Sequence, residues 1–372
     1  MRTGERSSAS SATEPRSRAR AYDFAILGAG ALGSILGAHL ARRGHSVALL
    51  ATARRAAEIE ARGLRIRGLE VLAPAVAVFT DATRCAGAEV LIVATKAIDT
   101  PAALRPYRSL PIGVALSIQN GIVKDEHLAA AFGRERVLGA IANTSGERLP
   151  DGEVLFTRNE LIAIGEPNGG IGARAPRIAA ALQDSGIRAE AVADIRSLEW
   201  AKFAAWAGLM ALSITTRAPT AHFLADPAAV RLLIAMVREI GALASAEGVA
   251  MTDRSTLPIA TICAGAEEDA LAPIRALAAD LARRAPEHRM SSLQDLDARR
   301  PLEIEETLGY ALRLAQRRGV AMPRLATLYP LAVAIDAVNR RSDPAAVVQR
   351  RDVGRFGEEQ PALRDETERG GE

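Results

Sequence analysis

The sequence predicts an α/β domain built on a parallel sheet, followed by a second domain made only of helices. A glycine-rich turn, Gly28-x-Gly30-x-x-Gly33, separates an apolar run at 22–27 from apolar residues at helical spacing. Short apolar runs then recur through the first half of the chain, as expected for buried strands. From about Ile195 onward they give way to long Ala- and Leu-rich segments, which indicate helices.

The glycine-rich turn lies in a stretch, 22–50, that predicts a strand, a turn, a helix and a second strand. Glycines permit a tight turn and close backbone approach, so that a pyrophosphate sits at the positive end of the helix. The motif alone is weak evidence, but here the flanking elements stand at the required distances. The alternative is an ordinary glycine-rich turn. We predict a Rossmann-type dinucleotide-binding domain, followed by an all-α C-terminal domain, with cofactor contacts from Gly28, Gly30, Ala31, Leu32 and Gly33.

The residues after the second strand predict which dinucleotide is bound. NAD-binding domains of this type usually offer an acidic residue to the ribose 2′-hydroxyl about 20 residues past the glycines. Here Leu50 is followed by Thr52, Arg54 and Arg55, and the first acidic residue after the turn is Glu58. A hydroxyl and two guanidiniums suit a 2′-phosphate, so we predict NADPH. The alternative is that the two arginines only begin a solvated helix.

Two further strands end in polar residues. An apolar run at 90–95 ends at Lys96, and a run at 114–118 is followed by Asn120 and Gly121. In an open parallel sheet, ligands collect beyond the carboxyl ends of the strands. Lys96 and Asn120 are therefore predicted to lie on the cofactor side, with a simple turn as the alternative for the second site.

The remaining segments complete the predicted domains. Residues 64–79 predict two short strands, 137–165 a hairpin around Asp151-Gly152, 175–183 a helix and 189–192 a last strand. The NADP-binding domain is predicted over 22–193 and the helical domain over 194–340, with helical segments at 198–213, 227–247, 264–284, 301–318 and 322–339. Residues 1–21 and 341–372 cannot build a core, so we predict a disordered N-terminal tail and a charged C-terminal tail.

Composition argues against several classes of protein. The net charge is +3 and the basic residues are scattered among acidic ones, so no nucleic-acid surface is predicted. No apolar run reaches the roughly 18 residues that suggest a membrane span. Cys85 and Cys263 show no CxxC spacing and predict two reduced thiols in a cytoplasmic protein. The five histidines form no metal-binding motif, so no metal site is predicted.

Lysine usage is unusual. Of the 47 basic residues, only Lys96, Lys124 and Lys202 are lysines. Arginine is the default cation of this chain, so a retained lysine suggests a task that arginine cannot perform, such as giving up a proton. Chance retention is the alternative.

Five pieces of sequence, in this order along the chain, resemble the ketopantoate reductase (2-dehydropantoate 2-reductase) family. They are GAGALG with GHSVALL, VATKAIDT at 93–100, SIQNGI at 117–122, LEWAKF at 198–203 and SSLQDLDARRPLEIE at 291–305. The resemblance runs from about Tyr22 to Ala337. It implies an NADPH-binding Rossmann domain, an all-helical domain that closes over it, and reduction of the C2 ketone of ketopantoate to pantoate, on the route to coenzyme A.

The resemblance also implies roles for individual residues. It places the catalytic lysine at Lys202, a second lysine near the cofactor at Lys96 and an asparagine of the site at Asn120. It places the substrate-binding serine at Ser291 and the acid that binds the substrate hydroxyl at Glu303. An ammonium beside the ketone can stabilise the developing oxyanion and donate a proton, whereas an arginine can do only the first.

Each role has a structural alternative. Lys202 could form an ion pair, for example with Glu199. Ser291 could cap the helix that follows it. Glu303 could be a first-turn carboxylate that faces the helix dipole.

The chain departs from the family on the helix that carries Lys202. Where the family has asparagines four and eight residues further on, this chain has Trp206 and Met210. Loss of two amides disfavours a polar substrate. Many members also carry arginine at the position of Thr52.

We predict NADPH-dependent reduction of a 2-oxo acid or related ketone. Alternatives are a less polar ketone, with Trp206 and Met210 shaping its pocket, and a non-catalytic NADPH-binding regulator. A homodimer through surfaces of the helical domain is a further hypothesis, which rests on fold analogy alone.

Overall fold

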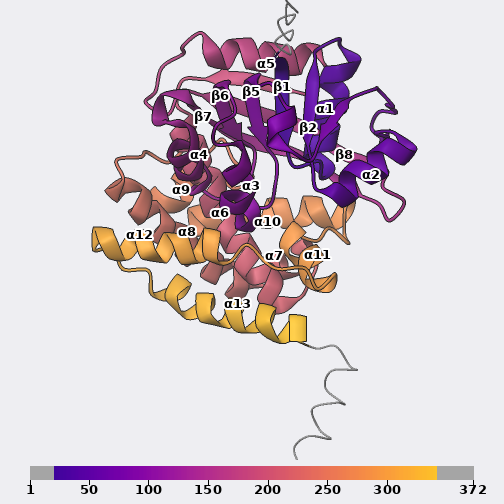
Figure 1. Cartoon of the computed structure of the whole chain (residues 1–372). Helices are drawn as coiled ribbons and strands as arrows, with labels where there is room; N and C mark the ends of the chain where they lie inside the picture. The colour runs from indigo at the N-terminus through magenta and orange to yellow at the C-terminus, as the bar shows by residue number, and fades with distance from the viewer. Residues whose placement is uncertain (1–20, 342–372) are drawn as a thin grey trace, which may run out of the picture.

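The structure is a computed structural model that describes residues 21–341. Figure 1 shows a sheet domain at the top and a helical domain below it. The sheet domain contains strands β1 (Tyr22–Leu27), β2 (Val47–Leu50), β3 (Ile66–Gly68), β4 (Ala77–Phe79), β5 (Ala88–Val93), β6 (Ile112–Ser117), β7 (Val137–Arg148), β8 (Val154–Gly165) and β9 (Ala189–Val192). Its helices are α1 (Ala31–Arg42), α2 (Ala53–Arg62), α3 (Thr100–Leu104), α4 (Lys124–Phe132) and α5 (Arg174–Asp184).

The strands form one sheet in the order β3-β8-β7-β6-β5-β1-β2-β4, with β9 paired to β8. Six neighbouring strands of this sheet, β7, β6, β5, β1, β2 and β4, are parallel to one another. This confirms the predicted parallel sheet. β7 and β8 are antiparallel, which confirms the predicted hairpin. Gly152 at the hairpin tip has φ +86, a conformation that favours glycine.

The sheet is apolar on both faces because helices cover both. Ile26 of β1 belongs to the core that contains Leu36 of α1, whereas the next residue, Leu27, belongs to the core that contains Leu128 and Phe132 of α4. Successive strand residues point to opposite faces, so one strand supplies both cores. This burial explains why β1, β2 and β5 consist mostly of apolar residues.

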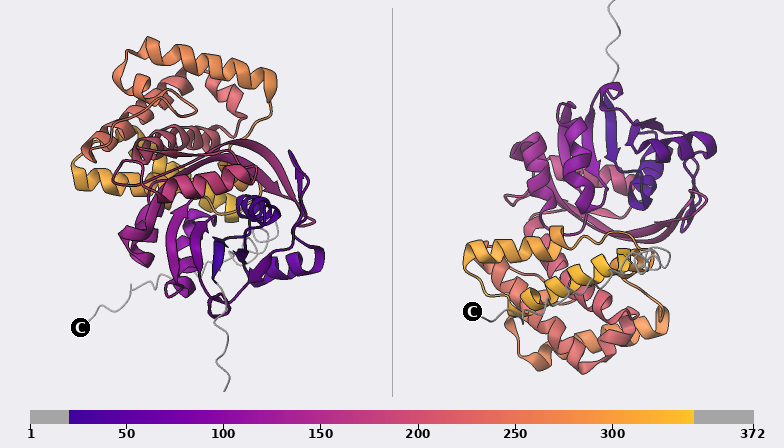
Figure 2. Two further views of the ribbon diagram at one scale, coloured as in Figure 1. Left: turned by 90° about the horizontal axis from the view of Figure 1, so that it is seen from above. Right: turned by 60° about the horizontal axis from the view of Figure 1, so that its bottom comes forward.

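The helical domain begins with a long helix that is buried on nearly every side. This first helix is α6 (Ile195–Thr216). The other helices of the domain are α7 (Thr220–Ala225), α8 (Pro227–Ala246), α9 (Ile259–Ala264), α10 (Glu267–Arg284), α11 (Ser291–Asp297), α12 (Tyr310–Arg318) and α13 (Pro323–Arg341). The Asp194 side chain caps α6 by accepting a hydrogen bond from the Ser197 N–H at 3.1 Å. Because α6 contacts β7 on one side and α8, α11 and α13 on the other, it joins the two domains (Figures 1 and 2).

The single helix predicted over 301–318 is wrong in its first turns. Residues 301–304 are not helical, and a π-helical turn, Glu305–Gly309, precedes α12. The Gly309 N–H bonds the carbonyl of Ile304 at 2.9 Å, five residues back. Hydrophobic spacing does not distinguish this turn from an α-helix, and such turns are common at functional sites.

Among the described residues, no helix is both long and apolar enough to cross a membrane. Both cysteines are free thiols, Cys85 buried and Cys263 partly buried. Apart from Ala21 and Arg341, the two predicted tails lie outside the described residues, and Arg341 ends α13.

Candidate active site

The glycine-rich turn leaves an open space at the start of α1. A Cβ on Gly28 would lie 2.8 Å from the Thr95 backbone nitrogen, and one on Gly33 would collide with the Gly28 carbonyl oxygen. A Cβ on Gly30 would meet nothing within 4 Å. No side chain caps α1 and its first turn contains no acidic residue, so its N–H groups face that space without a competing carboxylate. This arrangement fits a dinucleotide pyrophosphate.

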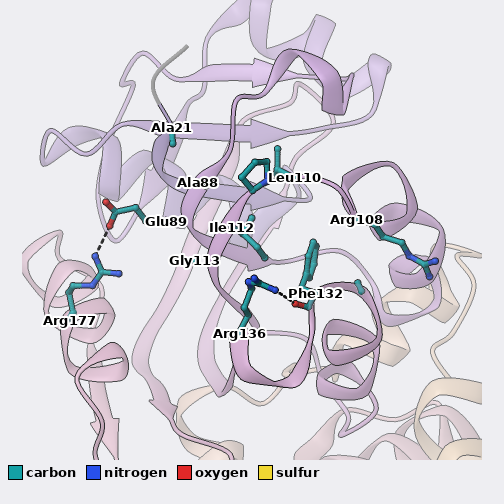
Figure 3. Close-up of a pocket in the computed structure, with 12 residues that line it drawn as sticks. Ala21, Ala88, Glu89, Arg108, Leu110, Ile112, Gly113, Phe132, Arg136 and Arg177 are labelled. Carbon is teal, nitrogen blue, oxygen red and sulfur yellow. Dashed lines mark hydrogen bonds and ion pairs between the residues drawn. The ribbon is translucent and has the colours of Figure 1, made fainter. Parts of the chain in front are cut away.

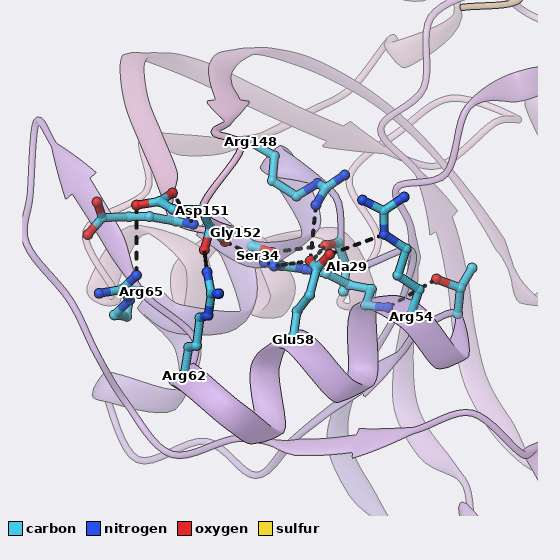
Figure 4. Close-up of polar contacts among 12 residues, drawn as sticks. Ala29, Ser34, Arg54, Glu58, Arg62, Arg65, Arg148, Asp151 and Gly152 are labelled. Atoms are coloured by element: carbon cyan, nitrogen blue, oxygen red, sulfur yellow. Dashed lines mark hydrogen bonds and ion pairs between the residues drawn. The ribbon is translucent and has the colours of Figure 1, made fainter.

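Arg55, predicted to contact a 2′-phosphate, is instead bonded to Ala29, Ser34 and Gly152. Figure 4 labels these three partners. Its Nε donates to the Ala29 carbonyl at 2.9 Å, Nη1 to the Gly152 carbonyl at 2.9 Å and Nη2 to the Ser34 hydroxyl at 3.2 Å. The residue is only 8% exposed. Arg55 therefore joins the glycine-rich turn to the tip of the β7–β8 hairpin, a structural role that the sequence did not reveal.

Arg54 and Thr52 occupy the rim of the same region. Thr52 caps α2, its hydroxyl accepting a hydrogen bond from the Arg55 N–H at 3.4 Å. The Arg54 side chain is 84% exposed and lies 3.3 Å from the Glu58 carboxylate. Of the two predicted arginines, Arg54 is thus the one whose guanidinium faces solvent.

A glutamine that sequence analysis did not single out fixes the next part of the site. Gln119 Nε2 donates to the Thr95 carbonyl at 2.8 Å and to the Thr100 hydroxyl at 2.5 Å. These bonds hold the turn after β6 against the turn after β5. Asn120, the next residue, is therefore held at the carboxyl edge of the sheet, and Gly121 beside it has φ +88.

Lys202 lies where that edge meets α6. A small cavity of about 10 Å³, room for about one water molecule, is lined by Gln119, Asn120, Gly121, Lys124, Ile141, Glu199, Lys202, Phe203 and Trp206. The Lys202 ammonium donates to the Ala142 carbonyl of β7 at 2.5 Å. The structure thus brings together three of the predicted site residues, Lys202, Asn120 and Trp206.

The cavity also holds a buried ion pair. Lys124 and Glu199, 2% and 7% exposed, pair with each other, and Asp125 lies 3.1 Å from Lys124. Glu199 Oε1 accepts a further hydrogen bond from the Ala140 N–H at 3.0 Å. The alternative partner considered for Lys202, Glu199, is therefore taken by Lys124. Lysine scarcity was the one sequence signal that pointed to Lys124.

The charges of Lys124, Glu199 and Lys202 shift one another's pKa values. Burial alone would lower the pKa of Lys124, but Asp125 and Glu199 outweigh it and raise that pKa. Burial and Asp125 raise the pKa of Glu199, and Lys124 opposes them. Burial, with the charges of Lys124 and Arg158, lowers the pKa of Lys202 to about 7. Lys202 can thus exchange a proton near neutral pH, as a general acid requires.

Glu303 and Lys96 form a second group of contacts between the domains. Glu303 Oε1 accepts a hydrogen bond from the Ala97 N–H at 2.5 Å, next to Lys96. Lys96 forms an ion pair with Asp295 of α11, which also binds Arg300 at 2.7 Å. Burial raises the pKa of Glu303 and Lys96 opposes it. Neither residue lines the cavity at Lys202.

Ser291 and Met210 also lie outside that cavity. Ser291 is exposed at the first position of α11, whose N-cap is Met290, so it is not the helix cap considered as its alternative. The next residue, Ser292, is buried and its hydroxyl has no protein partner. Met210 is 1% exposed and packs in the core of the helical domain, in contrast to its expected place beside the substrate.

A larger hollow, of about 780 Å³, lies elsewhere on the sheet domain (Figure 3). Ala88 and Ile112, which line it, are the first residues of β5 and β6. Ligands of open parallel sheets bind beyond the other, carboxyl ends. Despite its size we therefore assign the chemistry to the region around Lys202.

Comparison with known proteins shows the family of this chain. The family model described as "Ketopantoate reductase PanE/ApbA" matches residues 24–169, and its C-terminal counterpart matches residues 194–336. The chain belongs to the ketopantoate reductase family. A 2-dehydropantoate 2-reductase of Archaeoglobus fulgidus is 30% identical over 79% of this chain and 91% of its own length. Members of this oxidoreductase family bind a nicotinamide dinucleotide.

Solved structures show the same architecture. The 2-dehydropantoate 2-reductase of Methylococcus capsulatus is 26% identical, with a TM-score of 0.71 over 86% of this chain and 98% of that one. A D-mandelate dehydrogenase complex with NADH and anilino(oxo)acetate has a TM-score of 0.73 over 85% of this chain and 99% of that one. At 20% identity this second likeness shows the fold alone.

Two glycine variants test the cofactor turn. Gly30→Ala should fold normally, since its Cβ meets nothing, but weaken dinucleotide binding about tenfold or more by occupying the space for the pyrophosphate. Gly33→Ala should lower stability as well, because α1 must shift away from Gly28. Thermal unfolding and fluorescence titration with NADPH measure both. Unchanged binding by folded Gly30→Ala would contradict the assigned site.

Proposed function

We propose that this chain reduces the ketone of a 2-oxo acid with NADPH and that Lys202 donates the proton. The observation that carries the proposal is the placement of Lys202 and Asn120 together at the carboxyl edge of a dinucleotide-binding sheet. The name of the Archaeoglobus relative supports the same class of reaction.

The preference for NADPH rests on Arg54. Its guanidinium is exposed beside the end of β2, and the position offers no carboxylate that would bind a ribose 2′-hydroxyl before Glu58. Glu58 itself contacts Arg54, Arg55 and Arg148. These arginines leave it poorly placed to accept a ribose hydroxyl.

The reaction needs one hydride and one proton. When bound, the reduced nicotinamide supplies the hydride to the ketone carbon. The carbonyl electron pair moves to oxygen, where the Lys202 ammonium stabilises the charge and transfers a proton. The product is a 2-hydroxy acid, and Lys202 regains its proton from solvent. Asn120 can donate a hydrogen bond to a substrate oxygen from the same edge.

Entry of the substrate requires the two domains to separate. A cavity of about 10 Å³ cannot hold a 2-oxo acid. The contacts that close the junction, Glu303 with Ala97 and Lys96 with Asp295, would open in that motion. Glu303 would then be free to meet the substrate, as the family resemblance implies.

A less polar substrate than ketopantoate is favoured by Trp206. Its indole lines the cavity where the family has an asparagine amide, so the site offers apolar surface in place of a hydrogen bond. We therefore expect 2-oxo acids with large apolar side chains to be the better substrates.

Lys202→Ala should lower kcat at least about 100-fold and leave NADPH affinity nearly unchanged, because the variant loses only the proton donor. In the unaltered protein, kcat/KM should be level below pH 7 and fall as pH rises through about 7, since the ammonium is then lost. Absorbance of NADPH, followed with a panel of 2-oxo acids, measures both. Retained turnover in Lys202→Ala would refute the role. Binding of NADPH without consumption of any ketone would favour a regulator.

The adjacent arginines form a matched pair. Arg54→Leu should weaken NADPH binding about tenfold, leave NADH binding unaltered and change stability by less than about 0.5 kcal/mol. Arg55→Leu should cost about 2 kcal/mol of unfolding free energy by leaving three acceptors unpaired. Denaturant unfolding and titration with both nucleotides measure these effects. Equal losses of NADPH and NADH affinity in Arg54→Leu would rule out a 2′-phosphate contact.

Trp206→Asn should move substrate preference toward ketopantoate. We expect the ratio of kcat/KM for ketopantoate to that for phenylpyruvate to rise about tenfold or more, because a buried amide replaces apolar surface. Trp200→Phe is the control: Trp200 is buried in the helical core and does not line the cavity. A ratio that does not move in Trp206→Asn would exclude Trp206 from substrate selection.

A further inference from the structure

Two of the charged residues in the cavity have no task in the reaction proposed above. Lys124 and Glu199 are buried beside Lys202, yet neither supplies the hydride or the proton. Burying such charges is costly, and only close pairing offsets the cost.

The geometry keeps Lys202 without a counter-charge. Glu199 stands three residues before Lys202 on α6, a spacing at which side chains meet, and would be its natural partner. Lys124, the first residue of α4, takes that carboxylate instead and is held by Asp125 at 3.1 Å. Lys202 is left with a neutral acceptor, the Ala142 carbonyl at 2.5 Å.

We propose that Lys124 is a positioning residue that favours proton release by Lys202, by occupying Glu199 and by adding a second positive charge to the cavity. The proposal deepens the proposed function, since it rests on the catalytic role of Lys202. Lys124 touches neither substrate nor cofactor and acts only through Lys202.

The charges around Lys202 other than that of Lys124 do not by themselves explain why its pKa is lowered. The charges that act on Lys202 come from Glu199 of α6, Lys124 of α4 and Arg158 of β8. Asp125 of α4 lies beside Lys124, at 3.1 Å. Arg158 is half exposed, so water screens its charge, whereas Lys124 is buried and its charge acts at close range. The lowered pKa of Lys202 agrees in direction with this arrangement.

The scarcity of lysine makes the test direct. The chain has only three lysines, so protein labelled with ¹³C at lysine Cε gives three side-chain signals, assigned from single lysine substitutions. Titration of these signals with pH reports each ammonium separately. The measurement needs neither nucleotide nor substrate.

In Lys124→Met we expect the Lys202 midpoint to rise by roughly one pH unit or more, because Glu199 is released and a like charge is lost. Lys124→Arg, which keeps the charge, should restore the midpoint toward that of the unaltered protein. If Lys124 only supports the fold, the midpoint of folded Lys124→Met stays in place, and that result would overturn the proposal.

A second variant covers the case in which Lys124→Met does not fold, as judged by circular dichroism. In Glu199→Gln the Lys124 signal should titrate at lower pH, and the Lys202 midpoint should not rise. A rise in the Lys202 midpoint would overturn the proposal, because loss of the neighbouring negative charge of Glu199 should make the Lys202 ammonium less favourable and not more favourable.

Activity separates this proposal from the proposed function. If ketones are reduced, the alkaline fall in kcat/KM should move upward in Lys124→Met by as much as the Lys202 midpoint. If the unaltered protein reduces no ketone, the proposed function fails while the titration still decides the role of Lys124.

Discussion

The buried ion pair between Lys124 and Glu199 is the contact on which the junction of the two domains depends. Helix α6 is apolar on nearly every side, and an unpaired carboxylate inside it would be strongly destabilising. Pairing with Lys124 ties α6 to α4, and the Ala140 N–H ties it to β7. A Cβ on Gly139 would lie 2.8 Å from Ile195, so glycine permits this close approach.

These contacts of Glu199 hold α6, and with it Lys202, against the sheet domain, and Lys202 itself forms no ion pair in them. Its ammonium reaches the Ala142 carbonyl from α6, while Gln119 holds the Asn120 turn at the end of β6. The two groups come from different domains but share one cavity. Contacts that fix the domains relative to each other are therefore also contacts that position Lys202 and Asn120.

The fold could be predicted from sequence because its signals are local. Periodicity and turn residues indicated the parallel sheet and the hairpin at Gly152. The site could be predicted only in part, since its decisive contacts join distant residues: Arg55 meets Gly152 and Lys124 meets Glu199, 97 and 75 positions apart. Composition gave one indication of the contact between Lys124 and Glu199, because Lys124 is one of few lysines in an arginine-rich chain.

Helix geometry explains why only one of the two altered family positions shapes the cavity. Each residue turns an α-helix by about 100°, so a residue four positions from Lys202 lies about 40° away and one eight positions on lies about 80° away. Trp206 therefore still faces the cavity, whereas Met210 has turned into the helical core. Of the two residues that replace the family's asparagines, Trp206 therefore lines the cavity, whereas Met210 packs among the apolar residues of the helical domain.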